Sequence, residues 1–240
     1  MKLGIIGCGA IGTDVAKAAD NMEEIEKVNV FDIIPAAAQK LCSSIKKASI
    51  KPVEKFLLDV DVVFEAASQQ AVTQYAIPVL EAGKDLIIMS IGSLFNDALR
   101  KKLETIARTH HRKIYLPSGA VCGIDGVLAA SIEKLDSVTL VTTKPPASLG
   151  KSVEERTVIF KGNARDAVKQ FPRNINVAAC LSLAGVGSDE TNVEIVADPV
   201  ETRISHKILA HGRFGRLRAE VENMPNPNNP QSSYMASLSA

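Results

Sequence analysis

The sequence has no tryptophan and few other aromatic side chains, with three tyrosines and seven phenylalanines among 240 residues. So few rings argue against a surface that binds single-stranded nucleic acid by stacking its bases. An excess of one charge is also missing, because 28 lysines and arginines balance 27 acidic residues. A net charge of +1 gives nucleic acid and anionic membranes no electrostatic attraction, so we expect neither as a partner.

Long hydrophobic runs are absent as well. No apolar stretch approaches the roughly 18 residues that a membrane-spanning helix requires. The apolar residues 1–7 lack a small-residue cleavage site and lead directly into a glycine motif. We therefore interpret them as a buried strand and not as a signal sequence, and we expect a cytoplasmic protein.

Patterns for disulfides and metal sites are missing too. The four cysteines show no CxxC pair, which is typical of reduced thiols in a cytosolic enzyme: Cys8, Cys42, Cys122 and Cys180. The four histidines do not have the spacing of a zinc protease: His110, His111, His206 and His211. The sequence therefore predicts no bound metal.

The first half of the chain contains short apolar strands that alternate with single helices. The predicted strands cover residues 2–7, 28–33, 61–66, 85–90 and 113–117, and the helices cover 13–22, a segment from Pro35, 70–80 and 96–109. Strands with continuous hydrophobic content, separated by helices, indicate a parallel sheet covered on both faces. The fold class is therefore α/β, with a doubly wound Rossmann domain over residues 1–117.

The pattern changes after Ser118. Strands are predicted over 137–143, 155–161, 192–197, 203–210 and 216–222, and helices over 164–170 and 176–185. This predicts a second, α+β domain over 118–222 with a mixed or antiparallel sheet, serving catalysis and dimerisation. Residues 223–240 are rich in proline and asparagine, and we expect a C-terminal tail that packs back on the first domain.

A glycine motif follows the first strand. Residues 7–12 read Gly-Cys-Gly-Ala-Ile-Gly, and they open the first helix. Gly7 allows a tight turn, Gly9 lets the backbone approach a pyrophosphate, and Gly12 lets helix and strand pack closely. The helix N-terminus, with Ala10 and Ile11, offers N–H groups to the phosphates.

Asp32 completes this motif. It stands 20 residues after Gly12 at the end of the second strand, where a carboxylate accepts hydrogen bonds from the adenosine ribose. A carboxylate there repels the 2′-phosphate of NADP. The sequence therefore predicts NAD as the cofactor, with NADP as an open alternative.

The second half supplies candidates for proton transfer. An unperturbed histidine has a pKa near neutrality, about 6.5, which suits acid/base work. His206 lies inside a predicted strand, whereas His211 falls in a predicted turn, and either could be a plain surface residue. His110 and His111 close a charged helix and are expected to be solvated.

Three polar clusters could face a ligand. Ser118, Gly119 and Ala120 follow the last Rossmann strand, at the edge where open α/β sheets bind ligands. Asn176 stands at a helix start, where it could cap the helix, contact the cofactor or do both. Lys144 ends a strand and could be an ordinary exposed turn lysine or a cation for the substrate.

The combined pattern resembles the L-aspartate dehydrogenase family along nearly the whole chain. The resemblance rests on the glycine motif, Pro117-Ser118-Gly119-Ala120 with Gly123-Ile124-Asp125, Thr143-Lys144-Pro145-Pro146, residues 171–179, Ala197-Asp198-Pro199 and His206-Lys207-Ile208. The block 171–179 is its most specific part.

The resemblance implies NAD(P)-dependent oxidative deamination of L-aspartate to iminoaspartate, which hydrolyses to oxaloacetate and ammonia. It implies His206 as the acid/base and Ala120 and Asn176 as contacts of the nicotinamide cofactor. It also implies a place in NAD biosynthesis. Independently of the resemblance, the strand-rich second half could present an exposed sheet face, which favours a homodimer. The two carboxylates of aspartate need hydrogen-bond donors or positive charges in the site. The candidates for this role are Ser118, Gly119, Lys144 and Arg173.

Two alternatives stay open at this point. A phosphorylating semialdehyde dehydrogenase would need a cysteine nucleophile, and Cys122 is the candidate, although its small and apolar neighbours favour a buried, inert thiol. A non-catalytic dinucleotide sensor would bind the cofactor without turning over any substrate.

Overall fold

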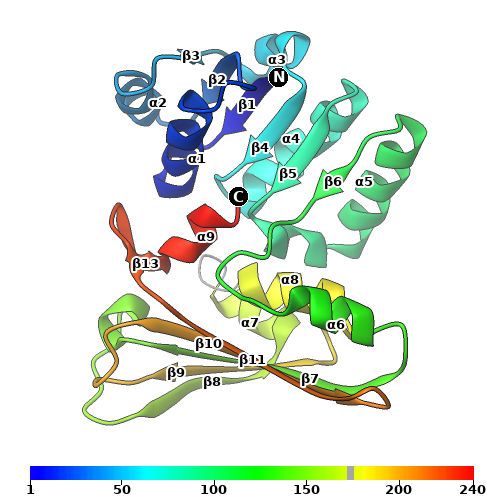
Figure 1. Ribbon diagram of the computed structural model, residues 1–240, viewed down its shortest axis with the longest axis vertical. Helices are drawn as coiled ribbons and strands as arrows, with labels where there is room; N and C mark the ends of the chain where they lie inside the picture. Colours follow the sequence, from blue (N-terminus) through cyan, green and yellow to red (C-terminus); the bar gives the residue numbers. More distant parts are fainter. Residues whose placement is uncertain (172–175) are drawn as a thin grey trace. The chain divides into compact units, whose positions relative to one another are not determined.

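The computed structural model describes residues 1–171 and 176–240, and the chain forms two compact units. The first unit is Met1–Pro117 together with Ala240, and the second is Ser118–Ser239. Each unit has its own sheet, and both sheets are seen in Figure 1.

The first unit contains a six-stranded sheet in the order β3-β2-β1-β4-β5-β6. Its strands are β1 (Lys2–Ile6), β2 (Lys27–Phe31), β3 (Ala48–Ile50), β4 (Val62–Glu65), β5 (Asp85–Ile88) and β6 (Ile114–Tyr115). Every neighbouring pair is parallel. The chain therefore winds outward in both directions from β1, which confirms the doubly wound Rossmann sheet.

Helices connect these strands. They are α1 (Ala10–Asp20), α2 (Pro35–Cys42), α3 (Val53–Phe56), α4 (Gln69–Glu81) and α5 (Asp97–Thr109), with 3₁₀ turns η1 (Leu57–Asp59) and η2 (Ile91–Phe95). Their starts follow local chemistry: Pro35 occupies the first turn of α2, and the Ser68 and Asn96 side chains cap α4 and α5. The short elements β3 and α3 were not predicted, because three or four residues show no hydrophobic period.

The second unit contains a five-stranded sheet in the order β11-β10-β7-β9-β8. Its strands are β7 (Leu135–Lys144), β8 (Thr157–Asn163), β9 (Thr191–Ala197), β10 (Ile204–Gly212) and β11 (Gly215–Asn223). The pair β7–β9 is parallel and the other pairs are antiparallel. The prediction of a mixed sheet in an α+β domain is therefore confirmed.

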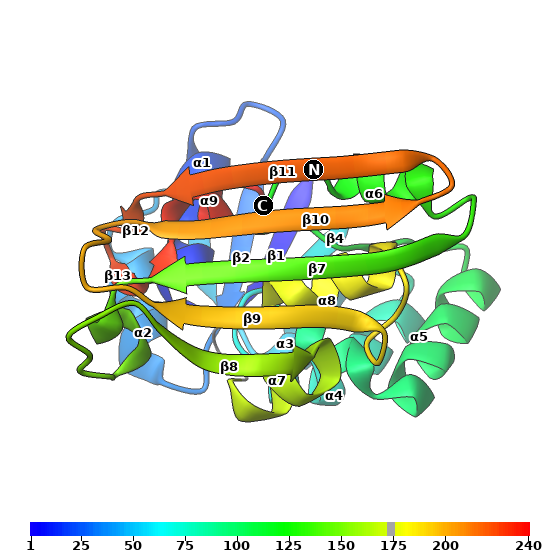
Figure 2. The same ribbon diagram turned by 90° about the horizontal axis from the view of Figure 1, so that it is seen from below.

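Helices cover one face of this sheet: α6 (Ile124–Ala130), α7 (Ala164–Gln170) and α8 (Asn176–Ala184). A 3₁₀ turn, η3 (Pro146–Leu149), follows β7. Figure 2 shows the sheet from the side without these helices. Burial along β10 alternates accordingly: Ile204, His206, Ile208 and Ala210 are buried, whereas Ser205, Lys207, Leu209 and His211 are partly or fully exposed. His206 therefore lies on the helix-covered face.

The last residues form a small hairpin and a helix. They are β12 (Pro225–Asn226), β13 (Asn229–Ser233) and α9 (Tyr234–Leu238). The buried Asn226 Nδ2 donates to the buried Ser237 Oγ over 2.9 Å. Residues 223–239 belong by their contacts to the second unit, and Ala240 belongs to the first.

Candidate active site

The three glycines between β1 and α1 differ in what their missing side chains leave free. Gly7 has φ +102°, and a Cβ there would lie 2.7 Å from the carbonyl carbon of Ala66. A Cβ at Gly12 would overlap the carbonyl oxygen of Gly7, whereas nothing lies within 4 Å of the Cβ position of Gly9. Gly7 and Gly12 thus permit the turn and the helix–strand packing, and Gly9 leaves the backbone open to a ligand.

The N-terminus of α1 lies at this opening. The helix begins at Ala10, and its N-cap residue Gly9 makes no side-chain hydrogen bond. The first-turn residues Ala10 and Ile11 therefore present backbone N–H groups and the positive end of the helix dipole. These residues fit the pyrophosphate of a dinucleotide.

Asp32 follows β2 and is tied to the same turn. Its Oδ2 accepts from the Cys8 backbone N–H over 2.7 Å, and its Oδ1 accepts from the Ile34 N–H over 2.8 Å. A carboxylate has about four lone-pair positions, so Asp32 retains the capacity to accept ribose hydroxyls. These two bonds hold the Asp32 side chain beside the glycine turn that would bind the cofactor.

A cavity of about 100 Å³ lies beside Asp32 in the first unit. This is less than the roughly 300–1,000 Å³ of pockets that enclose a whole ligand, so it suits one part of a dinucleotide. The lining residues come from β1, β2 and the start of α4: Ile6, Gly7, Phe31, Asp32, Ile33, Ala67, Ser68, Gln70, Ala71, Gln74 and Tyr75.

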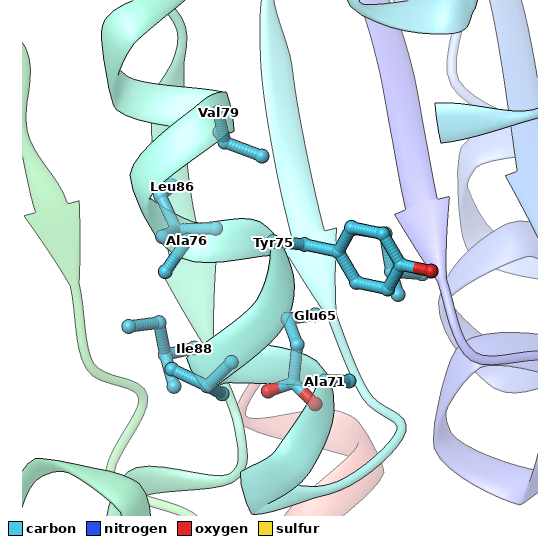
Figure 3. Close-up of a pocket in the computed structure, with 9 residues that line it drawn as sticks. Glu65, Ala71, Tyr75, Ala76, Val79, Leu86 and Ile88 are labelled. Atoms are coloured by element: carbon cyan, nitrogen blue, oxygen red, sulfur yellow. The ribbon is translucent and has the colours of Figure 1, made fainter. Parts of the chain in front are cut away.

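A second cavity, too narrow to hold a water molecule, lies next to it between α4 and the sheet (Figure 3). It is mostly apolar, but Glu65 at the end of β4 and Tyr75 on α4 line it. Glu65 is 1% exposed, and burial raises the pKa of its carboxyl group. Glu65 was not predicted as a site residue, although an acid at the end of the apolar run 62–64 was a usable signal.

His206 is the central titratable group of the second unit. It is 3% exposed on β10, and its Nδ1 lies 3.0 Å from Oγ1 of Thr142, its register partner on β7. Burial lowers the pKa of His206 from 6.5 to about 3, with a further contribution from the charge of Lys144. The imidazole is therefore neutral near neutral pH.

Lys144 lies near this histidine at the end of β7. It is 3% exposed, and burial lowers its pKa from 10.5 to about 8. Within the described residues it makes no ion pair or side-chain hydrogen bond. The alternative of an exposed turn lysine is therefore wrong, and a buried ammonium without a partner is a strong attractor for a carboxylate.

Asn223 lies near the same end of the sheet and was not singled out from the sequence. This buried residue pairs with Ile204, two positions from His206, and its Nδ2 donates to the Ala120 carbonyl over 2.9 Å. Its Oδ1 is the buried side-chain atom without a partner in the described part of the chain. Asn223 thereby holds Ala120 beside the edge strand β11.

The other predicted residues of the second unit are brought together in part. Gly119 has φ +69°, and a Cβ there would lie 3.6 Å from Cγ1 of Val177. The loop of Ser118 and Gly119 therefore lies against the first turn of α8, which begins at Asn176. Arg173, also predicted as a substrate contact, falls outside the described residues.

Two sequence-based expectations are wrong. His211 lies within β10 and not in a turn, because the β10–β11 ladder continues to Gly212. It is on the opposite face from His206, 3.4 Å from Asp136. Cys122 is exposed and not buried, because it precedes α6 in a loop, with its Sγ 3.8 Å from the Glu220 carbonyl oxygen.

Two kinds of feature are absent from residues 1–171 and 176–240. These residues contain no group of three or more histidine, cysteine or acidic side chains arranged to hold a metal ion. They also include no helix with the length and apolar character needed to cross a membrane.

A doubly wound sheet with an open glycine turn, and a second unit with a buried histidine and a buried lysine, define an NAD(P)-dependent oxidoreductase. Two family models divide the chain in the same way. Residues 7–117 match the NAD-binding domain of homoserine dehydrogenase, and residues 125–240 match the C-terminal domain of aspartate dehydrogenase.

Full-length relatives agree with the second match. The chain is 42% identical to an L-aspartate dehydrogenase of Methanosarcina barkeri, over 100% of this chain and 94% of the relative. It is 41% identical to that of Methanothermobacter thermautotrophicus, over 100% and 93%. The chain belongs to the L-aspartate dehydrogenase family, and it is an NAD(P)-dependent amino-acid dehydrogenase.

Solved structures give the same result. The crystal structure of aspartate dehydrogenase from Thermotoga maritima matches with a TM-score of 0.80 and 29% identity, covering 100% of this chain and 93% of that one. A putative myo-inositol dehydrogenase from Sinorhizobium meliloti matches with a TM-score of 0.59 and 14% identity, over 100% and 86%. The latter likeness concerns the fold alone. Family membership favours a catalytic dehydrogenase over the non-catalytic sensor.

Proposed function

We propose that this enzyme catalyses the NAD(P)-dependent oxidative deamination of L-aspartate to iminoaspartate, which hydrolyses to oxaloacetate and ammonia. The observation that carries the proposal is a neutral, buried His206 near a buried Lys144 whose ammonium has no partner among the residues that the structure describes. A proton acceptor and an anion-binding cation are what an amino dicarboxylate requires. The names of the full-length relatives support the choice of aspartate.

The first unit would hold the cofactor. Gly7, Gly9 and Gly12 shape the turn, and the N–H groups of Ala10 and Ile11 would bind the pyrophosphate. Asp32 would accept the adenosine ribose hydroxyls, which favours NAD and leaves NADP as the weaker cofactor. In the second unit, Ala120 and Asn176 would contact the nicotinamide end.

His206 would handle the proton. When bound, the nicotinamide ring supplies the acceptor for the hydride that leaves Cα of the substrate. His206 would accept the proton lost from the substrate amine and release it to solvent, and the neutral imidazole could then take a proton from the water that attacks the imine carbon. Thr142, 3.0 Å from Nδ1, would fix the imidazole ring while Nε2 faces the substrate.

Lys144 would bind a substrate carboxylate. A carboxylate bound to Lys144 would offset the positive charge of this lysine, which lowers the pKa of His206. Substrate binding would therefore raise that pKa and make His206 a stronger base. The loop of Ser118 and Gly119 and the side chain of Arg173 are the remaining candidates for the second carboxylate.

One assay tests the function. NADH formation is followed across a panel of amino acids and hydroxy acids, with ammonia measured in parallel. We expect L-aspartate to give the largest kcat/KM and one ammonia for each NADH. Turnover of a hydroxy acid without ammonia would overturn the proposal.

We also propose a cytoplasmic homodimer joined through the helix-free face of the second sheet. That face carries Leu209, 39% exposed, beside the Lys207–Glu220 ion pair at 3.0 Å. A two-fold axis would pair this face with its own copy. The unpaired cysteines fit a reducing compartment. Light scattering in solution should give twice the mass of one chain.

A further inference from the structure

Glu65 is an acidic side chain enclosed within the first unit. It is the last residue of β4, in the centre of the six-stranded sheet, and it is 1% exposed. Of the nine residues that line the adjoining cavity, only Tyr75 is also ionisable (Figure 3). A buried carboxylate is costly unless hydrogen bonds compensate it, so its partners indicate what it does.

Four donors surround this carboxylate, and they come from two loops. Oε1 accepts from the backbone N–H groups of Ala67 and Ser68, over 2.8 and 2.9 Å, and from Ser90 Oγ over 2.9 Å. Oε2 accepts from the Ser90 backbone N–H over 3.0 Å. Glu65 therefore joins the loop after β4 to the loop after β5.

The first of these loops borders the glycine turn. Ala67 and Ser68 line the same cavity as Gly7 and Asp32. A Cβ at Gly7 would lie 2.7 Å from the backbone nitrogen of Ala67, so the turn and the loop are in direct contact. A shift of this loop would therefore move one wall of the cavity beside Asp32.

The second loop lies on the other half of the sheet. Ser90 follows β5 and leads into η2 (Ile91–Phe95), which is buried throughout. In a doubly wound sheet the dinucleotide crosses the carboxyl edge, with the adenosine on the half that contains β2 and the nicotinamide on the half that contains β4 and β5. Glu65 thus lies where the two halves meet.

We propose that Glu65 is a positioning residue for the dinucleotide, because its carboxylate holds the loops after β4 and β5 in the arrangement that binds the cofactor. It acts through the backbone of Ala67, Ser68 and Ser90 and does not touch the cofactor itself. The proposal depends on cofactor binding alone, so it stands or falls independently of the aspartate chemistry.

The chemistry requires a carboxylate and not an amide. Both oxygens of the carboxyl group accept from backbone N–H groups, which can only donate, so each oxygen must offer a lone pair. A glutamine of the same shape could keep the Ala67 and Ser68 bonds with its oxygen, but its NH₂ group would face the Ser90 N–H. Two donors facing each other leave a buried N–H unsatisfied, so the β5 loop moves while the β4 loop stays.

The variant Glu65→Gln tests this by calorimetric titration with two probes, NAD and AMP. We expect NAD affinity to fall about tenfold, the effect of roughly 1.4 kcal/mol, because the nicotinamide half is displaced. AMP affinity should change less than about twofold, since the β4 loop and Asp32 keep their places. In steady-state kinetics, KM for NAD should rise while KM for the amino acid stays near the wild-type value.

Asn29→Ala provides a matched control. Asn29 is a fully buried polar residue of β2, bonded to Ser49 Oγ and the Asp59 carbonyl, and none of these residues lines either cavity. It should lose stability without a change in NAD affinity. If Glu65→Gln loses stability to the same extent with unchanged NAD affinity, or weakens AMP and NAD equally, the positioning role is overturned.

Ser90→Ala is a second variant that tests the positioning role of Glu65 if Glu65→Gln does not fold. This change removes one donor, the Ser90 hydroxyl, and leaves the backbone bond to Oε2. We expect NAD affinity to fall about threefold with AMP affinity unchanged, because the backbone bond from Ser90 to Oε2 still holds the loop after β5 and only part of the effect of Glu65→Gln is lost. Unchanged affinity for NAD in this variant would contradict the proposal.

Discussion

His206 is the residue on which the proposed chemistry depends most directly. Replacing it by alanine should lower aspartate turnover by about 100- to 10,000-fold, the usual contribution of a positioned acid/base group. NAD affinity should change little, because the glycine turn and Asp32 belong to the other unit. Steady-state kinetics and NAD titration of His206→Ala measure both quantities.

His211→Ala is the control for this variant. His211 lies on the same strand, five residues further on, but faces the opposite side of the sheet with its ring 51% exposed beside Asp136. It should retain nearly full activity. A large loss at position 211, or equal small losses at both positions, would assign the proton transfer to another group.

Lys144 should show a conflict between stability and activity. The drop of its pKa from 10.5 to about 8 means that the charged form is costly in the fold. Lys144→Met should therefore raise the free energy of unfolding near neutral pH, by up to about 3 kcal/mol. Urea denaturation measures this gain.

The same variant should raise KM for aspartate at least tenfold, since a charge-assisted hydrogen bond contributes about 1.5–3 kcal/mol. If Lys144→Met were less stable than the wild type and fully active, Lys144 would be a structural residue. Whether this lysine is buried could not be decided from its place before Pro145, because burial depends on the strands packed around it.

At the scale of elements, the turn between β1 and α1 provides the clearest test. Gly9→Val should fold normally, because nothing lies within 4 Å of its Cβ position and its φ of −72° suits any residue. The branched side chain would occupy the space of the pyrophosphate, so NAD affinity should fall at least about tenfold. Calorimetry measures the affinity, and thermal unfolding checks the fold.

The outcome for Gly12→Val should differ. There the added Cβ overlaps the Gly7 carbonyl, so the variant should lose stability as well as cofactor affinity. Normal NAD binding by Gly9→Val would remove this turn from the cofactor site.

Elements with a clear period or cap were predictable from local sequence, and short ones were not. The strands of the first unit are continuous apolar runs, and Ser68 and Asn96 mark the starts of α4 and α5. β3 and α6 have three and seven residues and were missed. Such segments are stabilised by the sheet or helix they pack against, which local propensity does not record.

At the scale of the whole molecule, His206 couples the site to acid stability. Its pKa of about 3 in the folded state lies below the ordinary 6.5, so the unfolded chain binds a proton that the folded one refuses. The free energy of unfolding should therefore fall as the pH drops from about 6.5 towards 3. Between about pH 7 and pH 4 this contribution is roughly 3 kcal/mol.

His206→Gln cannot titrate, so its stability should fall less steeply over the same range. Urea denaturation of both proteins at about pH 7 and about pH 4 gives the difference. Parallel losses in the two proteins would mean that His206 is protonated in the fold near its ordinary pKa.

The sequence by itself determined the two-part organisation, the parallel sheet and the glycine turn, because each leaves a pattern in short stretches of the chain. Glycine spacing and apolar runs act through local backbone freedom and burial. Only the tertiary structure decided the surroundings of His206. Its burial, its contact with Thr142 and its neighbour Lys144 arise from pairing β10 with β7, more than 60 residues apart. A pKa is set by such through-space burial and charge, which no stretch of sequence contains.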